Sequence, residues 1–278
     1  MMRAEVVAVV LSWNDAHRVI ALLERLATLD PAPDHVVVVD NGSADGAAGR
    51  IARAFPIHEI VCLDANRGFA AAANRGIERA LARGAAWVWL LNTDLVLPVS
   101  ALGLLRAAAE ADARFGMAGA VLTEADGSVQ ARGGGCVNLW TGASRHVVRA
   151  GQRCDYLSAA CLLLRAAMLR DTGLFDEGYF FYWEDIDLAF RARAAGWKLA
   201  LAGDCRVVHR EGSSLGRWSD QRWYHLFRGM SLFLRRRAPL PRTATVVRLL
   251  IHSATMLRHG RRDAVRGAWR AVVGDARR

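Results

Sequence analysis

The chain has 278 residues, of which 53% are hydrophobic, and this composition is typical of a folded protein with a large core and excludes a disordered chain. Residues 213–278 contain fifteen arginines and three aspartates and therefore carry a net charge of +12. The formal net charge of the whole chain is +10, so residues 1–212 carry a net charge of −2. The charge therefore argues against a nucleic-acid groove across the core. It favours a basic C-terminal part that meets an anionic partner such as phospholipid.

The five cysteines are odd in number and form no CxxC pair, so neither a disulfide framework nor a zinc site is expected. No run of eighteen or more apolar residues is free of polar interruptions. The N-terminal MMRAEVVAVVLSW carries Glu5 and lacks a small-residue cleavage site. We therefore expect a cytoplasmic protein whose membrane contact, if any, is peripheral and on the inner face of the cell membrane.

Apolar runs of strand length alternate with helical patterns through the first hundred residues. The pattern predicts strands at residues 5–13, 35–40, 57–63 and 85–92, and helices at residues 16–29, 47–54 and 69–82. Strands and helices that alternate with short connections predict an α/β fold, in which helices cover both faces of a parallel sheet. Ligands bind beyond the carboxyl ends of such strands, so the residues that follow each strand are the first candidates for a site.

Each of these four strands ends in polar residues, at 12–14 (SWN), 40–43 (DNGS), 64–76 (DANRGFAAAANRG) and 92–94 (NTD). Taken singly, such residues are typical of strand-to-helix turns, where short polar side chains satisfy free backbone groups. Their recurrence along one edge of a single sheet indicates a shared binding site, and Asp40 is one of its four polar groups.

The turn after the first strand reads SWNDAHR, so the GxGxxG fingerprint of dinucleotide-binding folds is absent, and so is a Walker-type P-loop. A nucleotide phosphate would then need another source of positive charge, commonly a metal held by carboxylates. In LLNTDLVL, Asn92 and Asp94 are two residues apart and point to the same side of an extended backbone, where their oxygens can hold a hard cation. A cap for the following helix explains the same residues equally well.

Beyond residue 98 the pattern loosens into a helix near 100–111, a strand near 117–123 and a glycine-rich stretch. Residues 178–197, GYFFYWEDIDLAFRARAAGW, then place five aromatic residues directly before Glu184, Asp185 and Asp187 at the start of a helix. The helix macrodipole alone explains the acidic residues, but the aromatic run is typical of surfaces that stack against sugars. A carboxylate at this helix start would stay ionised and able to accept a proton. His209 follows a further strand and is either structural or a third metal ligand.

In this order and spacing, the motifs resemble the inverting GT-A glycosyltransferases of family 2, particularly the bacterial rhamnosyltransferase-like and galactofuranosyltransferase-like members. The resemblance covers roughly residues 5–214 and is carried by VVLSWN, VVVVDNGSADG, NRGFAAAANRGI, LLNTDLVL, DTGLFDEGYFFYWEDIDLAFRARAAGW and VVHREGSS. It implies the nucleotide-diphospho-sugar transferase (GT-A) fold with a mostly parallel central sheet. The glycosyltransferase domain would span residues 1–212, and a basic helical extension would span residues 213–278.

The resemblance also implies roles for individual residues. The donor nucleotide would be bound by Ser12, Asn14, Asp40, Asn66 and Arg67. A divalent metal, Mn or Mg, would be held by Asp94 with Asn92 and His209, in an NxD form of the family's frequent DxD motif. Asp185 would be the general base, and the acceptor would be contacted by Tyr182, Trp183 and Glu184.

The reaction implied by the resemblance moves a sugar from a nucleoside-diphosphate donor to a hydroxyl group of a glycan or lipid-linked acceptor, with inversion at the anomeric carbon. Cell-envelope polysaccharide synthesis is the expected setting, and rhamnose is one candidate sugar.

The C-terminal part contains an amphipathic basic helix. Apolar residues recur near helical spacing at Val246, Leu250, Ala254 and Leu257, while Arg248, His252 and Arg258 fall elsewhere on the helix. We expect the apolar stripe to pack on the core. Because the arginines are so numerous, peripheral association with a membrane that holds a lipid-linked acceptor is a second hypothesis.

Two other functions remain open. A sugar-nucleotide pyrophosphorylase would share the sheet and the nucleotide, but it needs a glycine- and basic-rich turn where this chain has SWNDAHR. A non-catalytic nucleotide-sugar-binding or scaffold module would be expected to lose the base or the metal ligand. Asp94 and Asp185 are both present, so an enzyme is favoured.

Overall fold

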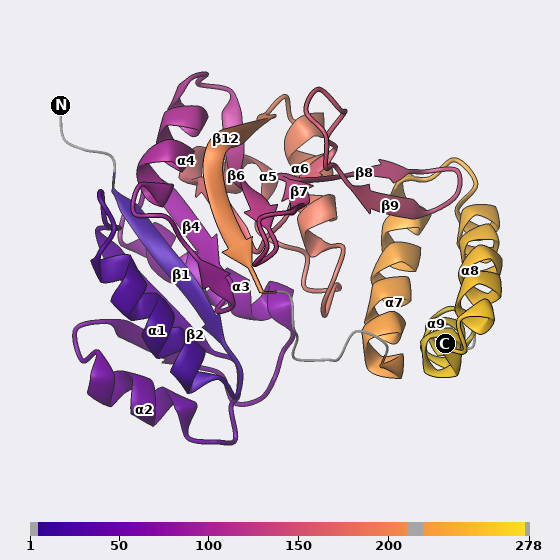
Figure 1. Cartoon of the computed structure of the whole chain (residues 1–278), viewed down its shortest axis with the longest axis horizontal. Coiled ribbons are helices and arrows are strands. Elements are labelled where there is room, and N and C mark those ends of the chain that lie inside the picture. The colour runs from indigo at the N-terminus through magenta and orange to yellow at the C-terminus, as the bar shows by residue number, and fades with distance from the viewer. Residues whose placement is uncertain (1–4, 211–218, 276–278) are drawn as a thin grey trace.

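The computed structural model of the protein describes residues 5–210 and 219–275 and has an α/β architecture (Figure 1). Its N-terminal half contains the predicted alternation: β1 (Val6–Ser12), α1 (Ala16–Ala27), β2 (His35–Asp40), α2 (Ala47–Ala54), β3 (Glu59–Cys62), α3 (Phe69–Ala82) and β4 (Trp87–Leu91). The middle of the chain adds β5 (Leu95–Val96), α4 (Ala101–Glu110), β6 (Phe115–Thr123), β7 (Val129–Arg132), β8 (Gly134–Asn138), β9 (Ala143–His146), β10 (Tyr156–Leu157), β11 (Cys161–Arg165), α5 (Ala166–Thr172), α6 (Glu184–Ala194) and β12 (Lys198–His209). Three helices follow: α7 (Asp220–Arg237), α8 (Pro241–Arg258) and α9 (Arg262–Asp275).

The central sheet has the strand order β3-β2-β1-β4-β11-β6-β12-β5, with β7 paired to β6. Its first four strands form the parallel run that the sequence predicts, with Val9 of β1 opposite Val37 on one side and Leu90 on the other. β11 lies antiparallel between β4 and β6, so the whole sheet is mixed. The parallel run therefore covers the strands whose carboxyl ends were predicted to meet.

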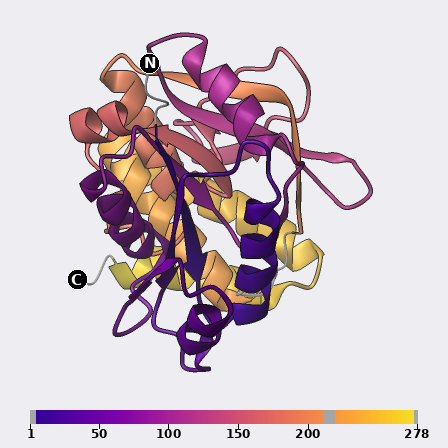
Figure 2. The ribbon, with the colours of Figure 1, turned by 90° about the vertical axis from the view of Figure 1, so that its left-hand side faces the viewer.

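The side chains of β1 alternate between two apolar layers. Val6, Ala8 and Val10 pack with α1, α2 and α4, whereas Val7 and Val9 pack with α3, α6 and α7. Because both faces are covered here, β1, β2 and β4 are continuous apolar runs with polar residues at or just beyond their ends. Figure 2 shows helices on both sides of the strands, with the C-terminal helices behind them.

The C-terminal helices share the core of the sheet domain. Four side chains of α7 are buried in the same cluster as residues of α3 and α6: Phe227, Met230, Phe233 and Leu234. A Cβ atom on Gly229 would lie 2.5 Å from the backbone oxygen of Tyr182, so only glycine allows α7 to approach this closely. The predicted boundary between residues 212 and 213 lies outside the described residues.

The apolar stripe predicted on α8 is exposed, so the expectation that it packs on the core is wrong. Val246, Leu250 and Leu257 are 48%, 54% and 55% exposed. The opposite side of α8 faces the protein instead, where His252 is buried with its ring 4.2 Å from that of Trp223. Ala244 and Leu249 of the same helix are also buried against the protein. Among the described helices, none has both the length and the apolar content to cross a membrane.

Candidate functional site

A cavity of about 460 Å³ opens at the carboxyl ends of the parallel strands, within the size range of small-molecule sites. One side, which we call the strand-end wall, is formed by Ser12, Asn41, Asn66, Asn92 and Asp94. The other side, the helical wall, comes from α7 and α9 and is formed by Gln221, Tyr224, His225 and Arg270. Phe180 and Phe181 also line the cavity. Residues from both ends of the chain, as distant as Ser12 and Arg270, therefore form one site.

Of the residues predicted to bind a nucleotide, Ser12 and Asn66 line the cavity, while Asp40 and Asn14 hold the loops behind its wall. The Asp40 carboxylate accepts hydrogen bonds from the hydroxyl and the backbone N–H of Ser43. The Ser43 hydroxyl oxygen accepts a hydrogen bond from the Asn14 backbone N–H at 2.8 Å. These bonds join the loop after β1 to the loop after β2 and fix the shape of the strand-end wall.

Asn41 organises the loop that follows β3. Its side-chain amide donates to Asn66 Oδ1 at 3.1 Å and to the Gly68 backbone oxygen at 3.2 Å, and its Oδ1 accepts from the Arg67 backbone N–H at 2.9 Å. The Arg67 guanidinium instead points to the surface, where it pairs with Asp64. A Cβ on Gly68, whose φ is +86°, would lie 2.4 Å from the Phe180 backbone oxygen, so glycine brings this loop onto the aromatic segment.

The predicted metal ligands lie together at the junction of β4, β5 and β12. His209 Nε2 is 3.4 Å from Asp94 Oδ1, and the backbone N–H of Arg210 donates to the Asp94 backbone oxygen at 2.9 Å. Among the described residues, Asp94 Oδ1 is buried and accepts no hydrogen bond. Asp94 is followed by a strand, and the cap of α4 is Ser100, so the alternative of a helix cap is not supported.

The hydrogen bonds of Gln130 orient His209. The Gln130 amide nitrogen donates to Glu124 Oε1 at 3.2 Å, which leaves its Oε1 to pair with His209 Nδ1 at 2.8 Å. Nδ1 is thus engaged by Gln130, and Nε2 is the ring nitrogen that faces the Asp94 carboxylate. A carboxylate oxygen and an imidazole nitrogen at this distance can serve as ligands of a divalent metal, and Asn92, which lines the cavity with Asp94, carries an amide oxygen. The described Asp, Glu, His and Cys side chains gather in no group of three, so any further ligands would come from amides, water or substrate.

Asp185 is the second residue of α6 and is connected to the strand-end wall through two consecutive residues. Its Oδ2 accepts a hydrogen bond from the Ala159 backbone N–H at 3.2 Å, and the Ala160 backbone oxygen accepts one from the Asn92 N–H at 2.9 Å. Burial raises the pKa of Asp185 to about 6, although the Ala159 and Ile186 N–H groups favour its ionised form. Burial and the charge of Asp185 raise the pKa of Glu184 well above its usual range.

The third acidic residue of this helix start has a structural role. Asp187 is buried and pairs with Arg191 at 2.7 Å, and the Arg191 guanidinium also donates to the backbone oxygens of Thr172 and Leu174. Arg191 thereby holds the end of α5 against α6. The acidic first turn thus combines a buried structural ion pair with two carboxyl groups of raised pKa.

The aromatic run divides between the cavity and the core. Tyr182 and Trp183 adopt left-handed backbone angles, with φ of +69° and +75°. Trp183 is 4% exposed and its ring packs 5.3 Å from that of Phe233, so it has no free face for a sugar. This corrects the expectation of an acceptor platform at Trp183, because α7 covers the ring. Phe180 and Phe181 provide the aromatic surface of the cavity instead.

No motif in the sequence indicates the residues of the helical wall. The His225 ring stacks on Phe180 with centroids 4.7 Å apart, and burial lowers its pKa. The Arg270 guanidinium pairs with Asp220 at 2.7 Å and lies 5.5 Å from the Tyr224 ring centroid. In the sequence these residues belong to a basic helical segment, and only its fold against residues 180–183 brings them to the cavity.

Comparisons with known proteins agree with this fold. The sequence model described as "Glycosyltransferase like family 2" matches residues 4–225. The chain is 33% identical, over 226 residues, to the N-acetylglucosaminyl-diphospho-decaprenol L-rhamnosyltransferase of Mycobacterium tuberculosis, and the match covers 70% of this chain and 74% of that protein.

Solved structures show the same fold. GalNAc-T7 with UDP, GalNAc and Mn²⁺ aligns with a TM-score of 0.66 and 12% identity over 84% of this chain and 48% of that longer chain. The mannosyltransferase PcManGT of Pyrobaculum calidifontis, in complex with GDP-Man and Mn²⁺, aligns with a TM-score of 0.60 and 19% identity over 99% of this chain and 76% of that chain.

The fold and the cavity at the strand ends thus define a GT-A glycosyltransferase. The chain belongs to the glycosyltransferase-like family 2. This membership confirms the resemblance seen in the sequence and leaves the pyrophosphorylase alternative unsupported.

Proposed function

We propose that this protein transfers a sugar, with L-rhamnose as the first candidate, from a nucleoside-diphosphate donor to a hydroxyl group of a lipid-linked saccharide in cell-envelope polysaccharide synthesis. The observation that carries the proposal is the cavity at the strand ends, where Asp94, whose Oδ1 accepts no hydrogen bond from the described residues, lies among amide and aromatic side chains. The mycobacterial relative supports the choice of sugar and acceptor class, because its name specifies both.

The donor would occupy the strand-end wall. Ser12 and Asn66 offer a hydroxyl and an amide to the nucleoside, and Trp13 offers an exposed ring at the cavity edge. Two guanidinium groups line the cavity, Arg18 from α1 and Arg270 from α9, and both suit a diphosphate. Asp40 and Asn14 would act indirectly, through the loops that they hold together.

The protein would use a divalent metal, Mn or Mg, held by Asp94 and His209 with Asn92. When bound, such an ion stabilises the negative charge that develops on the departing diphosphate. The Mn²⁺ in two structures of the same fold supports this choice of cofactor. Gln130 would keep His209 in the tautomer that offers Nε2.

Asp185 would act as the general base. Its raised pKa, about 6, leaves it largely ionised at neutral pH while making it a stronger proton acceptor than an exposed aspartate. In the reaction, the acceptor hydroxyl gives its proton to the Asp185 carboxylate and its oxygen bonds to the anomeric carbon. The bond from that carbon to the diphosphate breaks on the opposite face, so the anomeric configuration inverts.

The acceptor would be carried on a membrane lipid, and peripheral contact with the membrane would then involve the basic C-terminal helices. Tyr182 and Glu184 remain proposed acceptor residues because they adjoin Asp185 in the chain. The Tyr182 ring lies 4.1 Å from that of Phe181, which lines the cavity.

A transfer assay tests the proposal. The purified protein is incubated with deoxythymidine-diphosphate rhamnose and a short-chain polyprenyl-diphospho-N-acetylglucosamine, with and without Mn²⁺, and the product anomer is assigned by NMR. We expect metal-dependent transfer with inversion. The assay is repeated with sugars linked to uridine diphosphate and to guanosine diphosphate. If the protein binds a nucleotide but transfers no sugar from any of these donors to the acceptor, the scaffold alternative is preferred.

A further inference from the structure

An apolar surface on α8 and α9 is left open by the fold. Its side chains are 40% to 55% exposed and comprise Val246, Leu250, Ile251, Leu257, Trp269 and Val273. Single exposed apolar residues are common on proteins, but Val246, Leu250 and Leu257 recur along one side of α8, and Trp269 and Val273 lie one turn apart on α9, a spacing that favours an interaction surface. Trp269 Nε1 donates to Ser253 Oγ of α8 at 2.9 Å, so the two helices form one surface. We call these six residues the apolar face.

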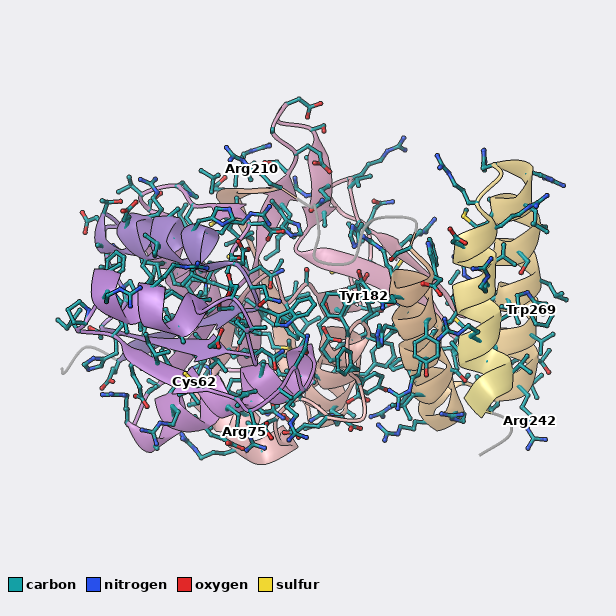
Figure 3. All side chains as sticks on the ribbon, turned by 90° about the horizontal axis from the view of Figure 1, so that it is seen from below. Cys62, Arg75, Tyr182, Arg210, Arg242 and Trp269 are labelled. Carbon is teal, nitrogen blue, oxygen red and sulfur yellow. The ribbon has the colours of Figure 1, made fainter. Side chains whose placement is uncertain are left out.

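The apolar face is separate from the side of α8 that contributes to the core. Ala244, Leu249 and His252 are buried against the rest of the protein, whereas Leu250 and Leu257 lie on the other side of the same helix. Figure 3 shows Trp269 at the outer edge of the C-terminal helices, away from the sheet. Polar side chains at these six positions would therefore be compatible with helix formation and with the packing of the core.

The positive charge around the apolar face favours a negatively charged partner. Residues 241–274 contain seven arginines and a single acidic residue, Asp263. Within the described part of the chain, Arg242, Arg258 and Arg262 are exposed and form no salt bridge, and the salt bridge given for Arg266 is to Asp263 at 3.4 Å. A second copy of this chain would bring the same arginines against these, and like charges oppose that contact. Anionic lipid headgroups attract arginine near the surface, and apolar side chains enter the headgroup boundary.

We infer that the apolar face docks on a bilayer that contains anionic lipid, and that this contact brings the helical wall of the cavity to the membrane. The second part rests on the proposed function, since it concerns an acceptor held by a lipid. α9 carries both surfaces, because Trp269 belongs to the apolar face and the next residue, Arg270, lines the cavity. α7, which packs along α9, adds Tyr224 and His225 to the same wall. A lipid-linked acceptor would thus be presented beside the helices that form the site.

Sedimentation with vesicles tests the docking. The full chain is incubated at physiological salt with vesicles of phosphatidylcholine alone, or of phosphatidylcholine and phosphatidylglycerol in equal parts, and the pelleted protein is measured. We expect at least about tenfold stronger binding to the anionic vesicles. The double variant Leu250→Glu/Leu257→Glu should lose about tenfold in that binding, because it places two charges on the apolar face.

Ile57→Glu is the matched control. Ile57 is 86% exposed in the loop between α2 and β3, so this variant also replaces an exposed apolar side chain by a carboxylate. It should bind the vesicles as the unchanged protein does. Failure of the unchanged protein to pellet with anionic vesicles, or undiminished binding of the double variant, overturns the inference.

A second variant and two further measurements complete the test. Arg258→Glu/Arg262→Glu keeps the apolar face and should lose the preference for anionic vesicles, which supports the inference even if the leucine variant fails to fold.

Analytical ultracentrifugation tests whether the apolar face binds a second copy of the chain instead. A dimer that Leu250→Glu/Leu257→Glu dissociates, together with no vesicle binding, overturns the inference. Calorimetry with a nucleoside diphosphate in the absence of lipid tests the proposed function separately, because donor binding does not require docking.

Discussion

The two walls of the cavity are built in different ways. The strand-end wall follows from the sheet itself, because neighbouring parallel strands bring Ser12, Asn41 and Asn92 to one edge. The helical wall depends on a tertiary contact, the close approach of Gly229 to the backbone of Tyr182. The strand-end wall therefore depends on the pairing of the strands, whereas the helical wall depends on how α7 packs against residues distant in the sequence.

The strongest test of this division is Asp185→Asn, which alters the proposed base next to the strand-end wall and preserves the size of the side chain. We expect the transfer rate to fall by about 10³-fold, because an amide cannot accept the proton of the acceptor hydroxyl. Nucleotide affinity, measured by calorimetry, should stay within about twofold, since the change in free energy is confined to the proton transfer. Substantial residual transfer would remove Asp185 from the role of base.

Asp94→Ala should reduce transfer by about 10²-fold and abolish the part of nucleotide binding that depends on Mn²⁺, because it removes the orphaned carboxylate. The comparison variant is Asp126→Ala, which removes an exposed carboxylate from the turn between β6 and β7. Equal metal dependence in the two variants would show that the cation, if one is used, is bound elsewhere.

The pH dependence of transfer tests the environment of Asp185. Since burial raises its pKa to about 6, the carboxyl group is protonated below that pH and cannot accept a proton. We therefore expect kcat/KM to be highest above pH 7 and about tenfold lower at pH 5, measured with the free donor and acceptor below their KM. A flat profile from pH 5 to pH 8 would contradict this assignment.

The helical wall is tested by Arg270→Ala, with Arg266→Ala one turn earlier on α9 as its control. Arg270 lines the cavity, whereas Arg266 pairs with Asp263 outside it. We expect affinity for a nucleoside diphosphate to fall about fivefold in Arg270→Ala, a modest loss because Asp220 already offsets part of the Arg270 charge. The Arg266 variant should bind normally, and equal affinities would exclude Arg270 from the donor site.

The parallel strands and their polar ends could be predicted because periodicity and turn residues are local signals. Ser12, Asn66, Asn92 and Asp94 line the cavity for this reason. Local signals do not reveal which side of a helix meets the core, so the stripe on α8 was placed inward although the helix carries apolar residues on both sides. Trp183 illustrates the same limit, because the ring that covers it lies fifty residues later, at Phe233.

The cavity also has an order of assembly. Domains fold as the chain leaves the ribosome, N-terminal parts first, and Arg270 is synthesised long after Asp94. A nascent chain that has completed only the parallel strands would expose Asp94, Asn92 and Ser12 to solvent, because the helical wall is not yet present. Because α7 supplies Gln221, Tyr224 and His225 and α9 supplies Arg270, the helical wall is complete only once both helices have packed beside the sheet.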